Sequence, residues 1–385
     1  MRGKSAHPVN WRPAHLEDLV FFQRGFDITK AEQRPGAIPV VSSSGIQSFH
    51  SAAKVEGPGV VIGRKGSLGT VHFINCPYWP HDTTLWSKDL RGNDPRYVYY
   101  FIRTMGFERY DVGNSNPTLN RNHIHGLDIL IPPLRTQKAI VEILSAYDDL
   151  IENNRRRIQL LEQSARLLYK EWFVHLRFPG HEHTKIINGV PEGWERKKIA
   201  EVCETLGGGT PSTKVSEYWD GDITWVVPTD ITNNNSLVLL ESERKITEKG
   251  LRKSSAKLVP AETILMTSRA SVGFFAVMDH EVCTNQGFIN IVPHDSQSRM
   301  YLLFNLLSRV NEIRSNAKGA TYPEISKGRF REMDIIIPGN THVSQFGTIA
   351  YDVIRQVRCL MRSNMNLAKA RDILLPKLMN GEVAV

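Results

Sequence analysis

The hexapeptide RKGSLG at residues 64–69 is repeated as SRASVG at residues 268–273, with the same glycine at its end. Each copy lies between two short β-like runs, a pattern typical of two strands joined by a glycine-bearing turn. Further along, LDILIP at residues 127–132 is repeated as MDIIIP at residues 333–338. Such internal repetition predicts two copies of one fold.

Other matches extend the duplication. The helix-like run at residues 96–105 is repeated at residues 299–308, and Trp11 corresponds to Trp194. From the glycine turn onward the copies are 203 to 206 residues apart, whereas the tryptophans are 183 apart. The second copy therefore contains about 20 extra residues after its tryptophan. We expect an α+β fold in which each copy has mostly antiparallel strands and one packed helix.

Within the copies, short apolar runs bounded by Gly, Pro or Asn indicate strands, and longer periodic runs indicate helices. The expected elements are strands at 60–62 and 70–74, a helix at 98–107, strands at 263–266 and 274–278, and a helix at 300–313.

A long amphipathic run follows each copy. From residue 136 to 178, apolar side chains recur at alternating spacings of four and three, the a/d pattern of a coiled coil. This seam comprises Ile140, Leu144, Tyr147, Ile151, Asn154, Ile158, Leu161, Ala165, Leu168 and Trp172. The sequence Phe178-Pro179-Gly180 is expected to end the helix, because proline cannot continue its hydrogen bonds.

The second run extends from residue 343 to 379. Every seventh residue is apolar, at Phe346, Val353, Leu360, Leu367 and Leu374, and Asn380-Gly381 is the expected C-cap. Because each seam is one-sided, we expect an antiparallel pair in which the first seam packs on the second. About 40 residues would form a rod of roughly 60 Å.

Two alternatives remain open for these helices. Each helix could instead fold back onto its own domain. Asn154 could fix the register of the pair, or it could be solvated at a frayed position. The charged run at residues 148–157 could be a solvated face with i,i+4 pairs or a docking surface, and Trp172 with Phe173 could form a partner patch or pack on the first domain.

The composition of the chain favours some classes of protein and argues against others. The chain has 48 Lys and Arg against 40 Asp and Glu, a formal charge of +8, which favours a polyanionic partner although many basic proteins have none. The four cysteines, at 76, 203, 283 and 359, are isolated, which argues against structural zinc and disulfides and fits a reducing cytoplasm. Neither a signal peptide nor an apolar run of about 18 residues is evident.

Four further motifs indicate a known family. These are IPPL at residues 131–134, LYKEWFV at 168–174, VPEGW at 190–194 and LLPKLMNGE at 374–382. In their order and duplication, the chain resembles the DNA-specificity subunits of type I restriction-modification systems.

The resemblance implies an organisation with approximate two-fold symmetry. Residues 1–134 and 179–340 would be target recognition domains, and residues 135–178 and 341–385 would be the antiparallel coiled-coil spacer helices. It further implies that the helices dock two methyltransferase subunits and that restriction and translocase subunits also join. S-adenosylmethionine, ATP and Mg would then bind those partners, and this chain would hold no cofactor.

The two copies differ in ways that predict different DNA half-sites. The aromatic residues Phe21, Phe22 and Phe26 have no close match in the second copy, which has its own polar insert at residues 232–236. Equivalent major-groove faces of B-form DNA lie one turn, about 34 Å, apart. We therefore expect an asymmetric, bipartite double-stranded DNA target with an unread spacer.

Candidate DNA contacts are side chains that suit phosphates or base edges. The glycine turns offer Arg64, Lys65 and Ser67 in the first copy and Arg269 and Ser271 in the second, although both could be ordinary solvated hairpins. Polar loops before the last strand of each copy could contact DNA or merely connect elements. They contain Asn114, Ser115, Asn116, Asn120, Arg121 and Asn122 in the first copy, and Lys318, Thr321, Tyr322, Ser326 and Lys327 in the second.

A third loop, Gly207–Gly209 with Lys214, is interpreted as a flexible DNA-facing loop or a simple turn. It lacks the GK[ST] ending of a Walker A loop and the spacing of a dinucleotide-binding turn. The chain also lacks an Asn-Pro-Pro-aromatic methyltransferase motif, and the histidine pairs at 123/125 and 181/183 have no completing metal ligands. We expect no catalytic and no metal site. The rival classes are an enzyme with a divergent site and a structural or regulatory protein.

Overall fold

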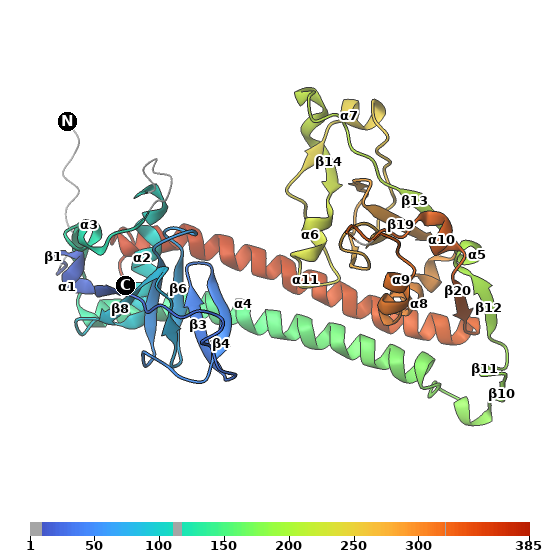
Figure 1. Cartoon of the computed structure of the whole chain (residues 1–385), viewed down its shortest axis with the longest axis horizontal. Helices are drawn as coiled ribbons and strands as arrows, with labels where there is room; N and C mark the ends of the chain where they lie inside the picture. The colour runs from blue at the N-terminus through green and yellow to red at the C-terminus, as the bar shows by residue number, and fades with distance from the viewer. Residues whose placement is uncertain (1–9, 111–117, 320) are drawn as a thin grey trace. The chain divides into compact units, whose positions relative to one another are not determined.

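The computed structural model of the chain describes residues 10–110, 118–319 and 321–385. Two compact units are distinguished by their internal contacts. Unit 1 comprises residues 1–150 and 366–385, and unit 2 comprises residues 151–365. The helices α4 (Leu134–Tyr169) and α11 (Asn340–Met379) each contribute to both units (Figure 1).

Unit 1 contains three small sheets. The largest has the antiparallel order β2-β8-β5-β6, the second has the order β4-β3-β7 with β7 parallel to β3, and the third pairs β1 with β9. Their strands are β1 (Arg12–His15), β2 (Phe21–Arg24), β3 (Ile38–Ser42), β4 (Gly45–His50), β5 (Gly59–Gly63), β6 (Val71–Ile74), β7 (Trp79–Pro80), β8 (Thr84–Asp89) and β9 (Asp128–Ile131).

One helix covers this sheet system in unit 1. Helix α2 (Pro95–Thr104) begins where the Asp94 carboxylate accepts hydrogen bonds from the backbone N–H groups of Arg96 and Tyr97, with proline at the first helical position. Its apolar side, including Val98 and Ile102, is buried in one core with strands β2, β5 and β8. The shorter helices of the unit are α1 (Leu16–Leu19) and α3 (Arg121–His125).

Unit 2 repeats this topology strand for strand. Its sheets have the orders β13-β19-β16-β17, β15-β14-β18 and β12-β20, and β18 is again parallel to its neighbour. The strands are β12 (Glu195–Lys198), β13 (Cys203–Gly207), β14 (Trp219–Val226), β15 (Lys245–Ile246), β16 (Ile264–Thr267), β17 (Phe275–Val277), β18 (Cys283–Thr284), β19 (Phe288–Pro293) and β20 (Asp334–Ile337). The predicted duplicated α+β fold is thus confirmed.

The helices of unit 2 differ from the prediction in one place. The run expected at 300–313 is broken into α8 (Arg299–Ser308) and α9 (Val310–Ser315), because Arg309 leaves the helical region with ψ of 20°. The remaining elements of the unit are α5 (Ile199–Val202), α6 (Pro228–Thr232), α7 (Glu248–Arg252), α10 (Lys327–Arg331) and the hairpin of β10 (Ile186–Ile187) with β11 (Val190–Pro191).

Within unit 1, the first part of α4 packs on the last part of α11. Ile140 and Leu144 share a buried core with Leu375 and Leu378. Asp148 of α4 also accepts hydrogen bonds from Arg371 of α11 and from the hydroxyl of Tyr100. The acidic start of the predicted charged run is therefore an internal ion pair in this unit.

Within unit 2, the second part of α4 packs on the first part of α11. Ile158 and Ala165 share a core with Ala350 and Val353, and the Asn154 amide donates a 2.9 Å hydrogen bond to Asn364. Residues later in α4 therefore pack on residues earlier in α11, which confirms the antiparallel pair. Asn154 is buried, so the solvated alternative for it is wrong.

The seam residues predicted from the heptads are all buried or half-buried. In α4, Leu144, Ile151 and Ile158 are buried and Leu161 is half-buried. In α11, Val353 is buried, whereas Leu360, Leu367 and Leu374 are half-buried. The buried residues of α11 beside them are Ala350, Ile354, Val357, Leu375 and Leu378. These positions also face the body of each unit, so the seam of α11 is wider than an a/d stripe.

Helix α4 ends differently from the prediction. It continues into a π-helical turn, η2 (Lys170–Val174), and stops there, before Phe178. Leu176 has a φ of +57°, a left-handed conformation that cannot continue a right-handed helix. Phe173 is buried among Tyr169, Trp194 and Tyr301 of unit 2, so the alternative in which it packs on the first domain is wrong.

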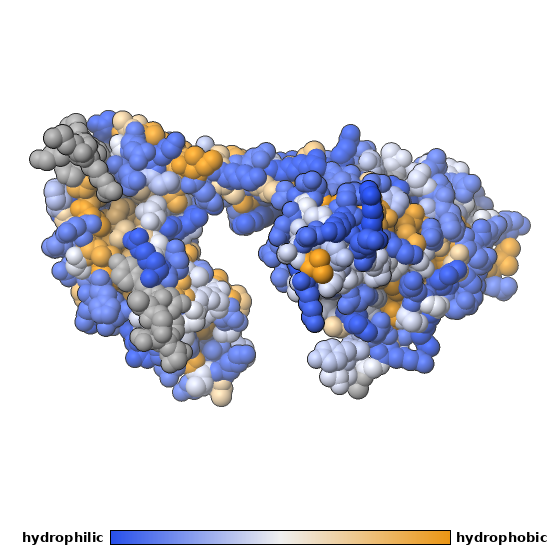
Figure 2. All heavy atoms as spheres, turned by 90° about the horizontal axis from the view of Figure 1, so that it is seen from above, coloured by the Kyte–Doolittle hydropathy of each residue, from blue (hydrophilic) through white to orange (hydrophobic). Residues whose placement is uncertain are grey.

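At the far end, the predicted C-cap of α11 is confirmed. Gly381 has a φ of +69°, and its N–H donates to the carbonyl of Leu378. No helix in the described part of the chain is both long and apolar enough to cross a bilayer. The face shown in Figure 2 is mainly hydrophilic, with apolar side chains in small separate groups.

Candidate nucleic-acid interface

Unit 1 contains a groove of about 1220 Å³ with a strongly cationic lining. Five basic side chains face two acidic ones, and aromatic and amide side chains lie between them. The basic residues are Arg24, Lys54, Arg64, Lys88 and Arg121, the acidic residues are Asp27 and Asp82, and the others include Phe21, Phe26, Trp79, Asn120 and Asn122. Positive charge, planar rings and side-chain amides in one concave surface suit a nucleic acid.

Three segments far apart in sequence meet at this groove. Arg64 begins the glycine turn after β5, and its backbone N–H donates a 2.8 Å hydrogen bond to the carbonyl of Thr83 in the turn before β8. The carbonyl of Arg64 accepts a 2.9 Å bond from the N–H of Leu119. Asn120 follows and caps α3 by accepting from the N–H of Asn122. The predicted turn and the predicted polar loop are therefore adjacent.

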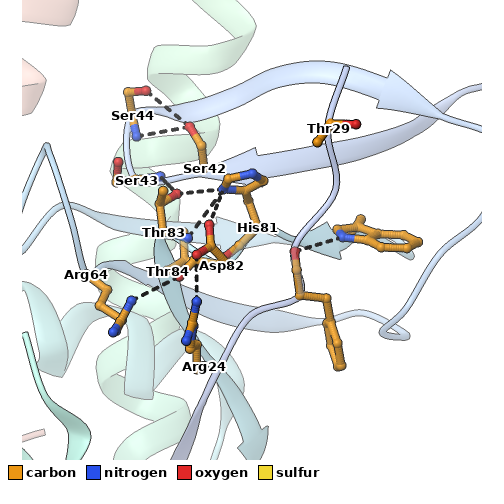
Figure 3. A network of polar contacts seen from close by, with 12 residues as sticks. Arg24, Thr29, Ser42, Ser43, Ser44, Arg64, His81, Asp82, Thr83 and Thr84 are labelled. Atoms are coloured by element: carbon orange, nitrogen blue, oxygen red, sulfur yellow. Dashed lines mark hydrogen bonds and ion pairs between the residues drawn. The ribbon is translucent and has the colours of Figure 1, made fainter. Parts of the chain in front are cut away.

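Asp82 organises the arginines of the groove (Figure 3). Its Oδ2 accepts a 2.8 Å bond from Nη2 of Arg24, and its backbone carbonyl accepts a 3.3 Å bond from Nη1 of Arg64. Desolvation, followed by repulsion from Arg24, lowers the pKa of Arg64 below its ordinary value. Two like charges are thus held close together, an arrangement that a polyanion would stabilise.

A further cation of the groove, Lys54, lies over two aromatic rings. The Nζ of Lys54 lies 4.9 Å from the centre of the Trp79 ring and 5.7 Å from that of Phe26. The indole N–H of Trp79 donates to the carbonyl of Phe26 at 3.2 Å, which fixes the ring. Such cation–π pairs place a lysine where a phosphate or a base can also reach it.

In unit 1, backbone hydrogen bonds join the glycine turn to the turn before β8 and to the polar loop, and this backbone frame occurs again in unit 2. The N–H of Ser268 donates to Gly287 and the N–H of Ile325 donates to Ser268, as Arg64 and Leu119 do in unit 1. Gly25 and Gly208 both leave no room for a side chain, since an added Cβ would lie 2.1 Å from the carbonyl oxygen of His81 or 2.0 Å from that of Asn285. The backbone equivalence therefore extends to the loops on either side of each glycine.

This equivalence agrees with the alignment of Arg64 with Ser268 in the repeat and extends it to positions outside the glycine turns. The paired positions, unit 1 first, are Arg24 with Gly207, Arg64 with Ser268, Asp82 with Gln286, Asn120 with Ser326 and Arg121 with Lys327. Lys327 approaches Gly207 closely, its Nζ lying 3.3 Å from where a Cβ of that glycine would be. The Gln286 Oε1 accepts a hydrogen bond from the hydroxyl of Thr210. Unit 2 is thus less cationic at these positions.

The predicted residues of unit 1 divide into two groups. Arg64, Asn120 and Arg121 line the groove, whereas Lys65 and Ser67 lie in the same turn outside the lining. The predicted Asn114, Ser115 and Asn116 lie outside the described residues.

In unit 2 the predicted residues are spread more widely. Arg269 is bridged to Glu324 at 3.0 Å, and the N–H of Ala270 donates to the carbonyl of Pro323, so the glycine turn contacts the loop of Tyr322. Tyr322 is 72% exposed. Ser271 lies within the turn, and its carbonyl accepts a hydrogen bond from the hydroxyl of Thr267. Lys214 is exposed, and its side chain has no described contact with the other predicted residues.

Several groove residues were missed from sequence. They are Arg24, Lys54 and Lys88 in unit 1. A cation of unit 2 was missed as well: the guanidinium of Arg244 lies 4.0 Å from the centre of the Trp219 ring and 5.1 Å from that of Trp225. The extra residues in the second copy obscure the alignment before the glycine turn, where Arg24 lies. A shared Gly25–Gly208 position was the available signal.

One group of histidine and acidic side chains has the spacing of metal ligands. Within the described residues, Asp27, His81 and Asp82 have donor atoms within 4.8 Å of one another. The Asp82 carboxylate is already paired with Arg24 at 2.8 Å, and the Nδ1 of His81 accepts a 3.3 Å hydrogen bond from the N–H of Thr83. His125 is a buried core residue whose Nε2 accepts from the N–H of Phe22 at 3.1 Å, and burial lowers its pKa.

A sequence profile described as "Type I restriction modification DNA specificity domain" matches residues 8–163 and 191–342. The specificity subunit of the type I restriction enzyme MjaIX of Methanocaldococcus jannaschii is 37% identical over 165 residues, 42% of this chain and 38% of that protein. The HindI specificity subunit of Haemophilus influenzae is 23% identical over 329 residues, 69% of this chain and 71% of that protein.

A solved structure shares the fold. The S subunit of a type I restriction-modification system from M. genitalium superposes with a TM-score of 0.63 at 15% identity, over 97% of this chain and 99% of that one. The match with the M. jannaschii relative spans less than two thirds of that protein's length.

Proposed function

The chain belongs to the type I restriction modification DNA specificity family, and from this membership we propose that it recognises an asymmetric, bipartite target in double-stranded DNA. Membership makes it the DNA-recognition component of a restriction-modification complex and not a catalytic subunit. One observation carries the finer proposal. Two equivalent frames present different side chains, such as Arg24 against Gly207 and Asp82 against Gln286.

Different side chains on one frame imply different half-sites. Base edges are distinguished by the pattern of donors and acceptors that the protein offers in the groove. Unit 1 offers mainly arginine and asparagine, whereas the equivalent positions of unit 2 offer serine, glutamine and a lysine. A single palindromic target would require like side chains at like positions, so the differences support an asymmetric target.

Partner subunits would supply the chemistry. We expect two methyltransferase subunits and the restriction and translocase subunits, which would hold S-adenosylmethionine, ATP and Mg, all acting in the cytoplasm on DNA. An exposed apolar row on one side of unit 2 supports such docking. Leu160, Leu167 and Val174 recur every seventh residue at 64%, 54% and 51% exposure. Such a row on a helix is typical of a partner-binding surface.

The test is methylome sequencing of the host with and without the gene. A split, asymmetric motif should be modified only when the chain is present, together with its methyltransferase subunits. Methyl transfer from a labelled donor by the purified chain alone would instead indicate an enzyme. Absence of any sequence-preferring DNA binding by the assembled complex would indicate a structural role.

A further inference from the structure

We propose that Arg24, held by Asp82, reads a guanine in the half-site bound by unit 1. This inference rests on the proposed function and names one base contact within it. The chemical ligand is the major-groove edge of guanine, and the contact is specific to one of the two half-sites.

Arg24 and Asp82 come from separate elements that meet in the lining of the groove. Arg24 is the last residue of β2, and Asp82 lies in the turn between β7 and β8. The Asp82 side chain is 18% exposed, whereas the Arg24 side chain is 56% exposed. The carboxylate is thus an anchor for the more exposed guanidinium that lies against it (Figure 3), and both side chains line the groove.

The second argument concerns hydrogen-bond donors. A guanidinium has five N–H donors and no acceptor. Among the described residues, the side chain of Arg24 has one hydrogen-bond partner, Asp82, which occupies Nη2. The remaining donors can meet the O6 and N7 acceptors of guanine in a bidentate contact, whereas adenine presents one acceptor and one donor on the same edge.

The third argument is preorganisation. A free arginine loses rotamer freedom when it binds a base, which reduces the gain in affinity. The 2.8 Å ion pair with Asp82 removes much of that freedom before DNA arrives. Because Asp82 also holds Arg64 through its carbonyl, a single turn orients two arginines.

Arg24 is a better base reader than its neighbour. Arg64 is half-buried and donates to a backbone carbonyl, whereas Arg24 is exposed. In unit 2 the equivalent positions hold Gly207 and Gln286, which cannot form this pair. The structure therefore restricts this device to the first half-site.

The experiment uses the full chain assembled with its methyltransferase subunits. Methylome sequencing first defines the target, and the half-site of unit 1 is the one retained when residues 190–338 are exchanged for those of a relative. If no split motif depends on the chain, the proposed function itself fails. If a motif is found but the half-site of unit 1 contains no guanine on either strand, the proposed function stands and this inference fails.

Binding is then measured on the target duplex and on duplexes with each base pair of that half-site replaced. The key variant is Arg24→Lys, which keeps the charge but loses the fork, with Arg24→Ala and Asp82→Asn beside it. We expect discrimination of about 5- to 150-fold at one guanine to be largely lost in Arg24→Lys, while the other positions keep theirs.

Two results would overturn the inference. If Arg24→Lys and Arg24→Ala both keep the discrimination between bases, the ion pair with Asp82 is only a structural contact. Equal weakening on every duplex would identify a phosphate contact instead. Gln286→Ala is the matched control in unit 2 and should leave the preference of the first half-site unchanged, and thermal unfolding of each variant verifies that the chain is folded.

Discussion

Units 1 and 2 hold the same loops in the same backbone geometry but equip them with different side chains. In unit 1 the frame carries Arg24, Arg64 and Asp82, whereas the equivalent residues of unit 2 are Gly207, Ser268 and Gln286. The comparison separates two tasks. Strand pairing and close glycine contacts fix the frame, and the exposed positions on it can change without altering the fold.

Unit 2 also carries an attachment that has no counterpart among the described residues of unit 1. Its polar insert is tied to α4 through Glu162, whose Oε1 accepts from the hydroxyl of Ser236 at 2.6 Å and from the N–H of Leu237 at 2.7 Å. The guanidinium of Arg244 lies over the rings of Trp219 and Trp225 in the same unit, at 4.0 Å and 5.1 Å from their centres. The second copy therefore differs by added structure as well as by substitution.

The largest expected effect tests whether the units are stabilised separately. Phe346 is fully buried in unit 2, with ring centres of Phe173 and Phe304 at 5.3 and 5.6 Å. Phe346→Ala should lower the unfolding free energy by about 3–5 kcal/mol. Hydrogen exchange should show that backbone amides lose protection in unit 2. Leu160→Ala, at a 64% exposed site, is the control, and equal loss of protection in unit 1 would contradict separate stabilisation.

The next effect tests the equivalence of the frames. An alanine at Gly25 or Gly208 would place a Cβ within about 2 Å of a backbone carbonyl oxygen, 2.1 Å and 2.0 Å respectively. Each substitution should destabilise its own loop by about 1–3 kcal/mol. In duplex-binding assays each should impair a different half-site. Gly126→Ala, which meets nothing within 4 Å, is the control, and a shared defect at one half-site would disprove the pairing.

A smaller effect sharpens the difference in charge between the glycine turns. Lys65 has no described side-chain partner, whereas Arg269 is paired with Glu324 at 3.0 Å. If each contacts a phosphate, Lys65→Ala should reduce the slope of log affinity against log salt by about 0.9. Arg269→Ala should reduce it less, because Glu324 already neutralises part of its charge. Identical slopes for both variants and the unaltered complex would rule out both contacts.

The smallest effect concerns the attachment of the insert. Desolvation raises the pKa of Glu162, an effect only partly offset by its hydrogen bonds to Ser236 and Leu237. A raised pKa means that the folded state binds the proton more tightly than the unfolded chain, so protonation stabilises the fold. The unfolding free energy should therefore rise relative to Glu162→Gln as pH falls through the folded-state pKa. Denaturant titrations across that range would measure the difference, and an opposite trend would refute the assignment.

Local patterns made much of this fold predictable. The glycine turns at 64–69 and 268–273, the strands that flank them and the α4 seam all follow from periodicity and turn chemistry, which depend on neighbours in sequence. The polar Asn154 within an apolar seam left two alternatives open, and its burial agrees with the one in which it fixes the register. Such signals are local, so they can be recognised in the sequence without knowledge of tertiary contacts.

The parts that escaped prediction depend on distant contacts. Arg24 and Asp82 are 58 residues apart, and neither lies in a recognisable motif. The early end of α4 at Val174 and the burial of Phe173 follow from packing against Trp194 and Tyr301 of unit 2. Arg121 was recognised as a candidate, but its partners in the groove were not, since three separated segments must fold before they meet.

The most direct measurement is a reciprocal exchange of segments followed by methylome sequencing. Replacing residues 190–338 with those of a relative should change one half of the modified motif and leave the other half intact. Replacing the corresponding part of unit 1, residues 10–131, should change the opposite half. If either exchange alters both halves, or if both exchanges alter the same half, the two units do not read separate sequences and the account is wrong.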